Sequence, residues 1–244
     1  MIEDRAKRGW LWTLLVLSAG LIAFSNYWKS SLKVKDVVIE GTKIVEKNEL
    51  LQLSQIRAGT LLYDADLTSI QRNVMSHHYV KDATVERNLP SSIRISVVER
   101  LPLALVNGNE VRYLDEEAVV LPHSVSKALF DLPVLSGLAN SDALKFGARV
   151  DNPDVQEALS ILSTAKLVSK ELFHLISEVQ IRRGDIVLYS AEWGIPIIFG
   201  RGEAPGKLVR LETFWSEIVK DRGAENLQYV DLRYDDQIVV RWRM

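Results

Sequence analysis

The hydrophobic pattern divides the chain into one long uncharged stretch and a larger region in which apolar and polar residues alternate. Residues 10–28, WLWTLLVLSAGLIAFSNYW, carry no charge. As a helix this stretch spans roughly 28 Å, close to the ~30 Å hydrocarbon core of a bilayer. Its ends hold aromatic residues, which favour membrane–water interfaces: Trp10, Trp12, Tyr27 and Trp28. The pattern therefore predicts a transmembrane helix over 10–28.

The same N-terminus also fits a cleaved signal peptide. Arg5 and Arg8 precede an apolar core at 11–24, and residues 23–25 offer a small-x-small cleavage site. We favour an uncleaved anchor because the apolar run is longer than a usual signal-peptide core and ends in aromatic residues. Basic residues flank the run on both sides, so they do not set its orientation. We expect the short tail, 1–9, to stay in the cytoplasm because a short tail and a large C-terminal region are easiest to insert that way.

After the anchor, residues 33–101 predict a small α/β domain. The expected order is strand, helix, helix, strand, strand: 34–40, 45–56, a helix capped by Asp66, 80–87 and 93–99. A three-stranded sheet with both helices on one face buries only one layer. The other face is therefore expected to be polar or to bind something.

Residues 102–244 predict a second α+β domain, with a mixed or antiparallel β-sheet and two helices. A proline opens each helix, at Pro153 and at Pro205, and residues 122–150 show no regular pattern. Strands are expected around turns at 107–109 and 115–117 and at 176–182, 185–190, 195–199 and 227–243. The buried face of the second helix is expected to hold Leu208, Leu211, Trp215 and Ile218.

The end of the chain predicts a strand at the edge of a sheet. Two sets of residues alternate there: Ile238, Val240 and Trp242 with Val239, Arg241 and Arg243. An uncovered apolar strand invites pairing with another chain unless charged residues guard it. The two arginines fit such guards. The edge equally fits β-augmentation, in which a partner's peptide adds as the next strand.

Composition places the chain among globular proteins and narrows the classes of partner. Hydrophobic residues make up 47% of the 244 residues, charged residues 25%, and the net charge is -2. The first 28 residues are net positive, so the remainder is acidic. This argues against nucleic-acid binding, which needs a basic patch. Cysteine is absent from the sequence, so the fold uses no disulfide and no thiolate metal site.

One segment looks like an enzymatic motif. Residues 200–207, GRGEAPGK, lie between a predicted strand and a predicted helix, as a phosphate-binding P-loop does. Five residues separate the outer glycines where the motif has four, and Leu208 replaces the Ser or Thr that binds magnesium. Nor do the histidines form a metal site, because the adjacent His77 and His78 point about 100° apart on a helix. We expect no catalytic residue, no cofactor and no metal ion.

The order of elements and several motifs resemble the FtsQ/DivIB family of bacterial cell-division proteins. Residues 33–101 are similar to its POTRA (polypeptide-transport-associated) domain, notably V-x-R-x-x-P at 85–90 and I-x-I-x-V-V-E-R-x-P at 93–102. LPVLSG at 132–137 and YVDLRY at 229–234 look like later family segments, and the second favours the FtsQ branch. Asp236 departs from the family, where a small residue is usual.

The resemblance implies a non-enzymatic scaffold of the divisome in the cell inner membrane, with a cytoplasmic N-terminus and a periplasmic C-terminal domain. It implies that the POTRA region helps recruitment to the septum and that the β domain binds two small bitopic partners, FtsB and FtsL. The implied partner surface consists of Arg233, Tyr234, Asp236 and Trp242 with either Arg182 or Arg183.

The implied recruitment surface consists of Val85, Arg87 and Glu99. Val85 is expected to belong to the core of the first domain, and the two charged residues to its surface. Charge reversal at Glu99 is then expected to leave the melting temperature nearly unchanged, because exposed charges contribute ~0–1 kcal/mol.

A different class of function is a POTRA-bearing accessory of protein transport or outer-membrane assembly. Such accessories carry several POTRA repeats, whereas the sequence shows one such pattern. Co-purification with partners extracted from the membrane separates the two possibilities.

Overall fold

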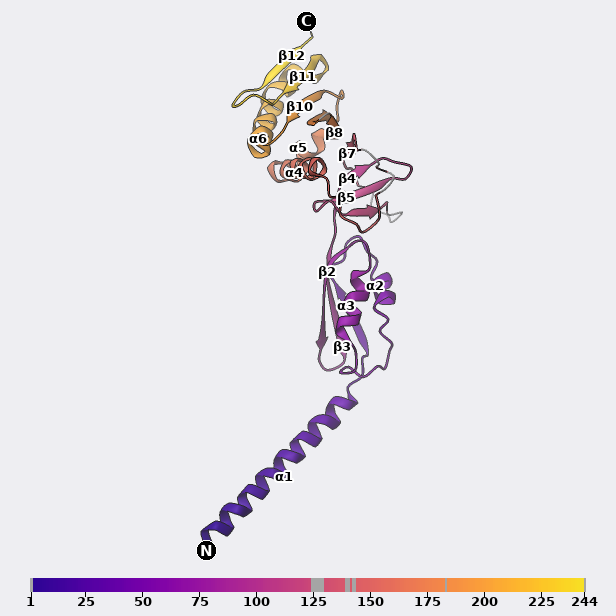
Figure 1. Cartoon of the computed structure of the whole chain (residues 1–244), viewed down its shortest axis with the longest axis vertical. Coiled ribbons are helices and arrows are strands. Elements are labelled where there is room, and N and C mark those ends of the chain that lie inside the picture. Colours follow the sequence, from indigo (N-terminus) through magenta and orange to yellow (C-terminus); the bar gives the residue numbers. More distant parts are fainter. Residues whose placement is uncertain (1, 124–129, 139–140, 142–143, 183, 244) are drawn as a thin grey trace. The chain divides into compact units, whose positions relative to one another are not determined.

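The computed structural model describes residues 2–123, 130–138, 141, 144–182 and 184–243 (Figure 1). The chain divides into two units, Met1–Glu99 and Arg100–Met244. Each unit contains helices and a β-sheet, so the α+β class predicted from the sequence is confirmed.

The first unit begins with one long helix, α1 (Ile2–Ser31). Many large apolar side chains of α1 are exposed, among them Leu15, Leu21 and Phe24. Among the described residues, no helix is both long enough and apolar enough to cross a membrane. The transmembrane span over 10–28 stays a prediction.

The remainder of the first unit is a three-stranded sheet with two helices, in the order predicted. Its elements are β1 (Asp36–Glu40), α2 (Lys47–Ser54), α3 (Leu67–Met75), β2 (Val80–Asn88) and β3 (Ser92–Glu99). β3 lies between β1, to which it is parallel, and β2, to which it is antiparallel. α3 begins where the sequence predicts, because the Asp66 carboxylate accepts hydrogen bonds from the N–H groups of Thr68 and Ser69.

Within the described residues, the second unit is built on one nine-stranded mixed sheet in the order β12-β11-β10-β9-β8-β7-β4-β5-β6. Its strands are β4 (Pro102–Val106), β5 (Arg112–Asp115), β6 (Val120–Pro122), β7 (Val134–Ser136), β8 (Ile176–Arg182), β9 (Asp185–Ser190), β10 (Pro196–Gly200), β11 (Leu227–Asp231) and β12 (Val239–Trp242). The last strand of the chain occupies one end of this sheet, as predicted.

β7 is a strand that the sequence pattern missed, since 122–150 was expected to be irregular. It has three residues, too few to show a period of two, and it is parallel to both β4 and β8. Gly137 follows it with a φ of +82°, and a Cβ at this position would lie 2.1 Å from the carbonyl oxygen of Ile181. Only glycine therefore allows the chain to leave β7 so close to β8.

The prediction of two helices in this unit is incomplete. The main helices are α4 (Pro153–Val168) and α6 (Ala204–Phe214). The shorter α5 (Lys170–Leu175) follows α4, and α6 continues into a π-helical turn (Trp215–Val219), α7 (Lys220–Arg222) and a 3-10 turn (Ala224–Asn226). The sequence pattern did not predict α5, because this helix has only six residues and starts immediately after α4. The side chain of Ser169 caps it by accepting a hydrogen bond from the N–H of Leu172.

The buried face predicted for α6 is correct at its start and wrong at Ile218. Leu208 and Leu211 are buried and Trp215 is partly buried, but Ile218 is 41% exposed and Val219 takes the buried place. A π-helical turn holds more residues than an α-helical turn, so it moves the apolar stripe along by one residue.

Candidate partner-binding site

β12 offers a free strand edge. It pairs antiparallel with β11, with Val240 opposite Val230 and Val239 opposite Asp231. No other strand in the described part of the chain pairs with β12. The backbone N–H and C=O groups along its outer edge are therefore available to a partner strand.

The side chains of β12 alternate between solvent and the helices. Val239 and Arg241 are exposed, whereas Ile238, Val240 and Trp242 are half-buried and pack against the core. The Arg222 guanidinium lies 5.7 Å from the centre of the Trp242 ring. Trp242 therefore contributes to folding as well as to the surface beside the edge.

A groove of about 500 Å³ lies between β12 and the helices, and it is lined by α6 and the π-helical turn on one side and by the helix-facing side chains of β12 on the other. Its lining includes the apolar side chains of Val209, Phe214, Ile218, Val240 and Trp242 and the charged ones of Arg210, Glu217, Arg222 and Asp236. Sequence reasoning missed the helical residues of this lining. The sequence pattern predicts that an apolar residue on an amphipathic helix belongs to the core. Ile218 is exposed only because the π-helical turn shifts the apolar stripe by one residue.

Arg233 is held in a fixed orientation by Asp231. The Asp231 carboxylate accepts hydrogen bonds from Nε (3.0 Å) and Nη2 (2.7 Å) of Arg233 and from its backbone N–H (3.0 Å). Burial alone would raise the pKa of Asp231, but these hydrogen bonds and the charges of Arg233 and Lys207 outweigh it and lower the pKa. Gly200 leaves room for the Arg233 side chain, since a Cβ there would lie 2.7 Å from Arg233 Cγ.

The turn between β11 and β12 presents two further residues of the predicted surface. Tyr234 is 48% exposed. Asp236 has a φ of 55°, a left-handed conformation that Asp tolerates better than most residues, and its side chain is almost fully exposed. Arg210 Nη1 lies 3.6 Å from the Asp236 carboxylate.

Arg182 and Arg233 both neighbour Asp185. Arg182 ends β8 opposite Asp185 of β9, and the Asp185 carboxylate lies 4.0 Å from Arg233 Nη1. Arg183 lies outside the described residues. Arg182 and Arg233 thus flank Asp185, while Asp236 and Trp242 line the groove.

In the first unit, Glu99 is a structural residue. Its carboxylate accepts hydrogen bonds from the N–H groups of Lys43 (2.9 Å), Ile44 (3.0 Å) and Val45 (2.8 Å). The side chain holds the segment between β1 and α2 against the end of β3. The expectation that Glu99 lies at the surface is wrong, since it is half-buried, and its substitution would deprive three backbone donors of their acceptor.

Arg87 likewise binds its own unit. It donates to the carbonyl oxygens of Leu62 (2.8 Å), Tyr63 (3.3 Å) and Ala65 (2.8 Å), and it is half-buried. Val85, expected in the core, is also only half-buried. Neither residue has the exposure that the sequence suggested.

The P-loop lookalike is a structural turn. Lys207 is buried and donates to the carbonyl oxygens of Phe199 (3.0 Å) and Arg201 (2.7 Å). Burial lowers the pKa of Lys207, and the charge of Arg210 acts in the same direction. Since the ammonium satisfies backbone carbonyls, it is not offered to a phosphate.

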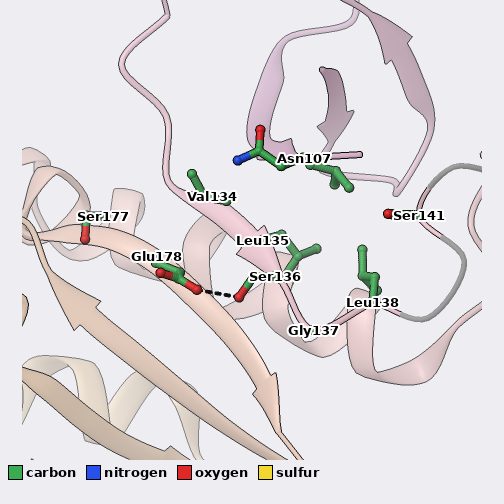
Figure 2. Close-up of a pocket in the computed structure, with 10 residues that line it drawn as sticks. Asn107, Val134, Leu135, Ser136, Gly137, Leu138, Ser141, Ser177 and Glu178 are labelled. Carbon is green, nitrogen blue, oxygen red and sulfur yellow. Dashed lines mark hydrogen bonds between the residues drawn. The ribbon is translucent and has the colours of Figure 1, made fainter. Parts of the chain in front are cut away.

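A second hollow of about 470 Å³ lies beside β7 and β8. Figure 2 shows Ser136 and Glu178 pointing toward each other there, with the Ser136 hydroxyl donating to the carboxylate at 2.5 Å. A serine paired with a carboxylate, with no histidine among the described residues of the lining, is a link between strands and not an activated nucleophile. Among the described residues, no group of three His, Asp or Glu side chains is placed to hold a metal ion.

Comparison with known proteins gives the two units an identity. The model of the FtsQ-type POTRA domain matches residues 32–100, and the model of the C-terminal region of cell division protein FtsQ/DivIB matches residues 104–233. The two matches follow each other along the chain, one in each unit.

Relatives from several bacteria match over most of their length. Cell division protein FtsQ of Geotalea daltonii is 27% identical over 212 residues, covering 86% of this chain and 75% of the relative. Cell division protein FtsQ of Rhodothermus marinus is 29% identical over 239 residues, covering 93% and 85%. That of Salinibacter ruber is 27% identical over 239 residues, covering 93% and 89%. The chain therefore belongs to the FtsQ/DivIB family of cell-division proteins.

Proposed function

We propose that this chain is a membrane-anchored scaffold of the bacterial divisome, whose second unit binds small bitopic proteins of the FtsB and FtsL type. The observation that carries the proposal is the free edge of β12 beside an apolar groove. Strand addition supplies backbone hydrogen bonds, and pockets for alternate side chains supply specificity.

The side chains around β12 favour a partner strand that carries both apolar and acidic residues. On the groove side, Ile218 and Trp242 would contact apolar side chains of the partner, and Arg222 would pair with a partner carboxylate. Near Asp185, Arg233 and Arg182 offer further guanidinium groups. Arginine forks suit carboxylates, and Asp231 already holds the Arg233 fork in place, which reduces the entropy lost on binding.

Attachment to the inner membrane forms part of the same proposal, with 1–9 as a cytoplasmic tail and 10–28 as the membrane helix. It is supported by the uncharged sequence of 10–28 and by the exposed apolar side chains of α1. Regions 33–101 and 102–244 would then lie in the periplasm.

Septal recruitment is assigned to the first unit. β2 is an edge of its sheet, and Val85 lies on this strand. Arg87 and Glu99 would support such a surface by holding the fold in shape, as their hydrogen bonds to the backbone indicate.

The test compares Tyr234→Ala with Trp242→Ala in the full chain. A purified periplasmic segment of an FtsB-type partner is titrated, and thermal unfolding is recorded in parallel. Tyr234→Ala should weaken binding by about 2 kcal/mol, as for an interface anchor, without lowering the melting temperature. Trp242→Ala should reduce both affinity and stability because Trp242 also packs on the core.

Tyr63→Ala is the matched control, because Tyr63 is a tyrosine of the first unit with similar exposure. It should leave partner affinity unchanged. Equal binding by the Tyr234 and Tyr63 variants would refute the proposed site.

A further inference from the structure

An exposed tryptophan stands at the tip of the hairpin that joins β9 and β10. Trp193 is 69% exposed and has a φ of 65°, and Gly194 follows with a φ of 56°. A left-handed conformation is an outlier for a bulky residue, and Asn or Gly would adopt it with less strain. The stability of the fold therefore does not explain why this position is a tryptophan.

A pocket of about 410 Å³ opens at the base of the same hairpin. Its apolar walls come from α5 and the π-helical turn, namely Leu172, Leu175 and Trp215. Ala191 of the hairpin also lines it, and the Ala191 N–H donates to the Leu175 carbonyl oxygen at 2.7 Å. This hydrogen bond fixes the hairpin, and with it the start of the turn that carries Trp193, to α5.

The charge around this pocket is negative. Three carboxylates line it, those of Glu171, Glu192 and Glu212, and none of them forms an ion pair with another described residue. The basic groups are Lys220 and His174, and His174 Nδ1 lies 3.5 Å from the Asp131 carboxylate. The pocket combines an indole wall with three carboxylates against one lysine, which suits a cationic side chain.

This pocket is distinct from the groove beside β12. Trp215 and Lys220 line the pocket, whereas Ile218 and Arg222 line the groove. The π-helical turn and the residues directly after it thus contribute to a pocket with three carboxylates and to a groove in which two arginines face two carboxylates. Single-turn π-helical insertions occur often at functional sites.

We propose that Trp193 and this pocket form a second docking site, for a segment of a partner protein that carries basic and apolar side chains. A lysine or arginine of the segment enters the pocket against Trp215 and the carboxylates, and apolar side chains cover Trp193. Tryptophan is among the residue types most often found as binding anchors. The site selects basic side chains and does not depend on strand addition at β12.

The test uses the full chain in detergent micelles and a fluorescently labelled twelve-residue peptide of leucine and arginine, with a twin in which glutamate replaces arginine. The basic peptide should bind at least about tenfold more tightly than the acidic twin. Trp193→Ser and Glu212→Gln should each weaken binding of the basic peptide about tenfold, and added salt should weaken it further. Thermal unfolding verifies that each variant is folded.

Ile218→Ser is the control, because Ile218 is an exposed apolar residue that lines the other groove. Equal loss in this variant would overturn the proposal, as would equal binding of both peptides or no binding up to about 1 mM. Sedimentation adds a further outcome. Self-association that depends on Trp193 would identify a second copy of the chain as the occupant and would also overturn the proposal.

Discussion

At the scale of the residue, contacts decide whether a charged side chain supports the fold or serves the surface. Glu99 and Arg233 are both partly solvent-accessible. Glu99 satisfies three consecutive backbone donors, so its charge is used within the first unit. Arg233 is hydrogen-bonded to the carboxylate of Asp231, with Asp185 more distant at 4.0 Å, and its side chain is 47% exposed to a partner.

Replacing Glu99 with alanine should destabilise the first unit by about 2 kcal/mol, because backbone N–H groups lose hydrogen bonds to a charged acceptor. Urea unfolding of the full chain measures this loss. Glu86→Ala, at an exposed position on neighbouring β2, is the control and should change the free energy of unfolding by less than about 0.5 kcal/mol. Equal effects of the two substitutions would show that the hydrogen bonds of Glu99 contribute nothing.

At the scale of the element, one arginine ties the turn before α6 to the start of α4. Arg201 donates to the carboxylates of Glu157 and Asp154, and the Gly202 N–H donates to Glu157 at 2.9 Å. Burial alone would raise the pKa of Glu157, but the hydrogen bonds from Gly202 and Arg201 outweigh it, so the pKa is lowered.

A lowered pKa in the folded state means that the ionised Glu157 stabilises the fold at neutral pH. This stabilisation is lost as the pH falls below the unfolded value of about 4.3 and through the lower folded value. Arg201→Gln should therefore cost about 2 kcal/mol at pH 7, with a difference from the parent chain that shrinks below about pH 4. Denaturant unfolding across this range measures it.

Arg182→Gln, which removes an exposed guanidinium of the same unit, serves as the control and should show little effect at any pH. A cost of Arg201→Gln that stays constant down to about pH 3 would contradict the linkage to Glu157.

At the scale of the whole molecule, the chain consists of two units with separate cores. Ile95 is fully buried in the first unit, and Leu159 is almost fully buried in the second. The division lies between Glu99 and Arg100, where β3 ends. Arg100 belongs to the second unit, in which it donates to Asp115 at 2.7 Å.

Ile95→Ala and Leu159→Ala should each destabilise their own unit by about 3 kcal/mol, since both leave a cavity. Hydrogen exchange of backbone amides in β3 and β9 reports the two units separately. Ile95→Ala should accelerate exchange in β3 alone, and Leu159→Ala in β9 alone, so each variant is the control for the other. Acceleration of both strands by either substitution would show that the units unfold together.

Features that depend on neighbouring residues were determined by the sequence. Asp66 and Asn152 start their helices because a short polar side chain accepts the first free N–H groups, wherever the helix lies. Alternation likewise identified β2, β3 and the final strand. The family motifs predicted the order of the units, since they preserve local sequence around each turn and strand end.

Features that depend on distant contacts were decided only by the tertiary structure. β7 exists because β4 and β8 lie on either side of it, and the buried position passes from Ile218 to Val219 at a π-helical turn. The groove beside β12 needs α6 and the last strand together. A periodic pattern records which side of an element is apolar, but it carries no information on which backbone groups, from segments far along the chain, will meet a given side chain.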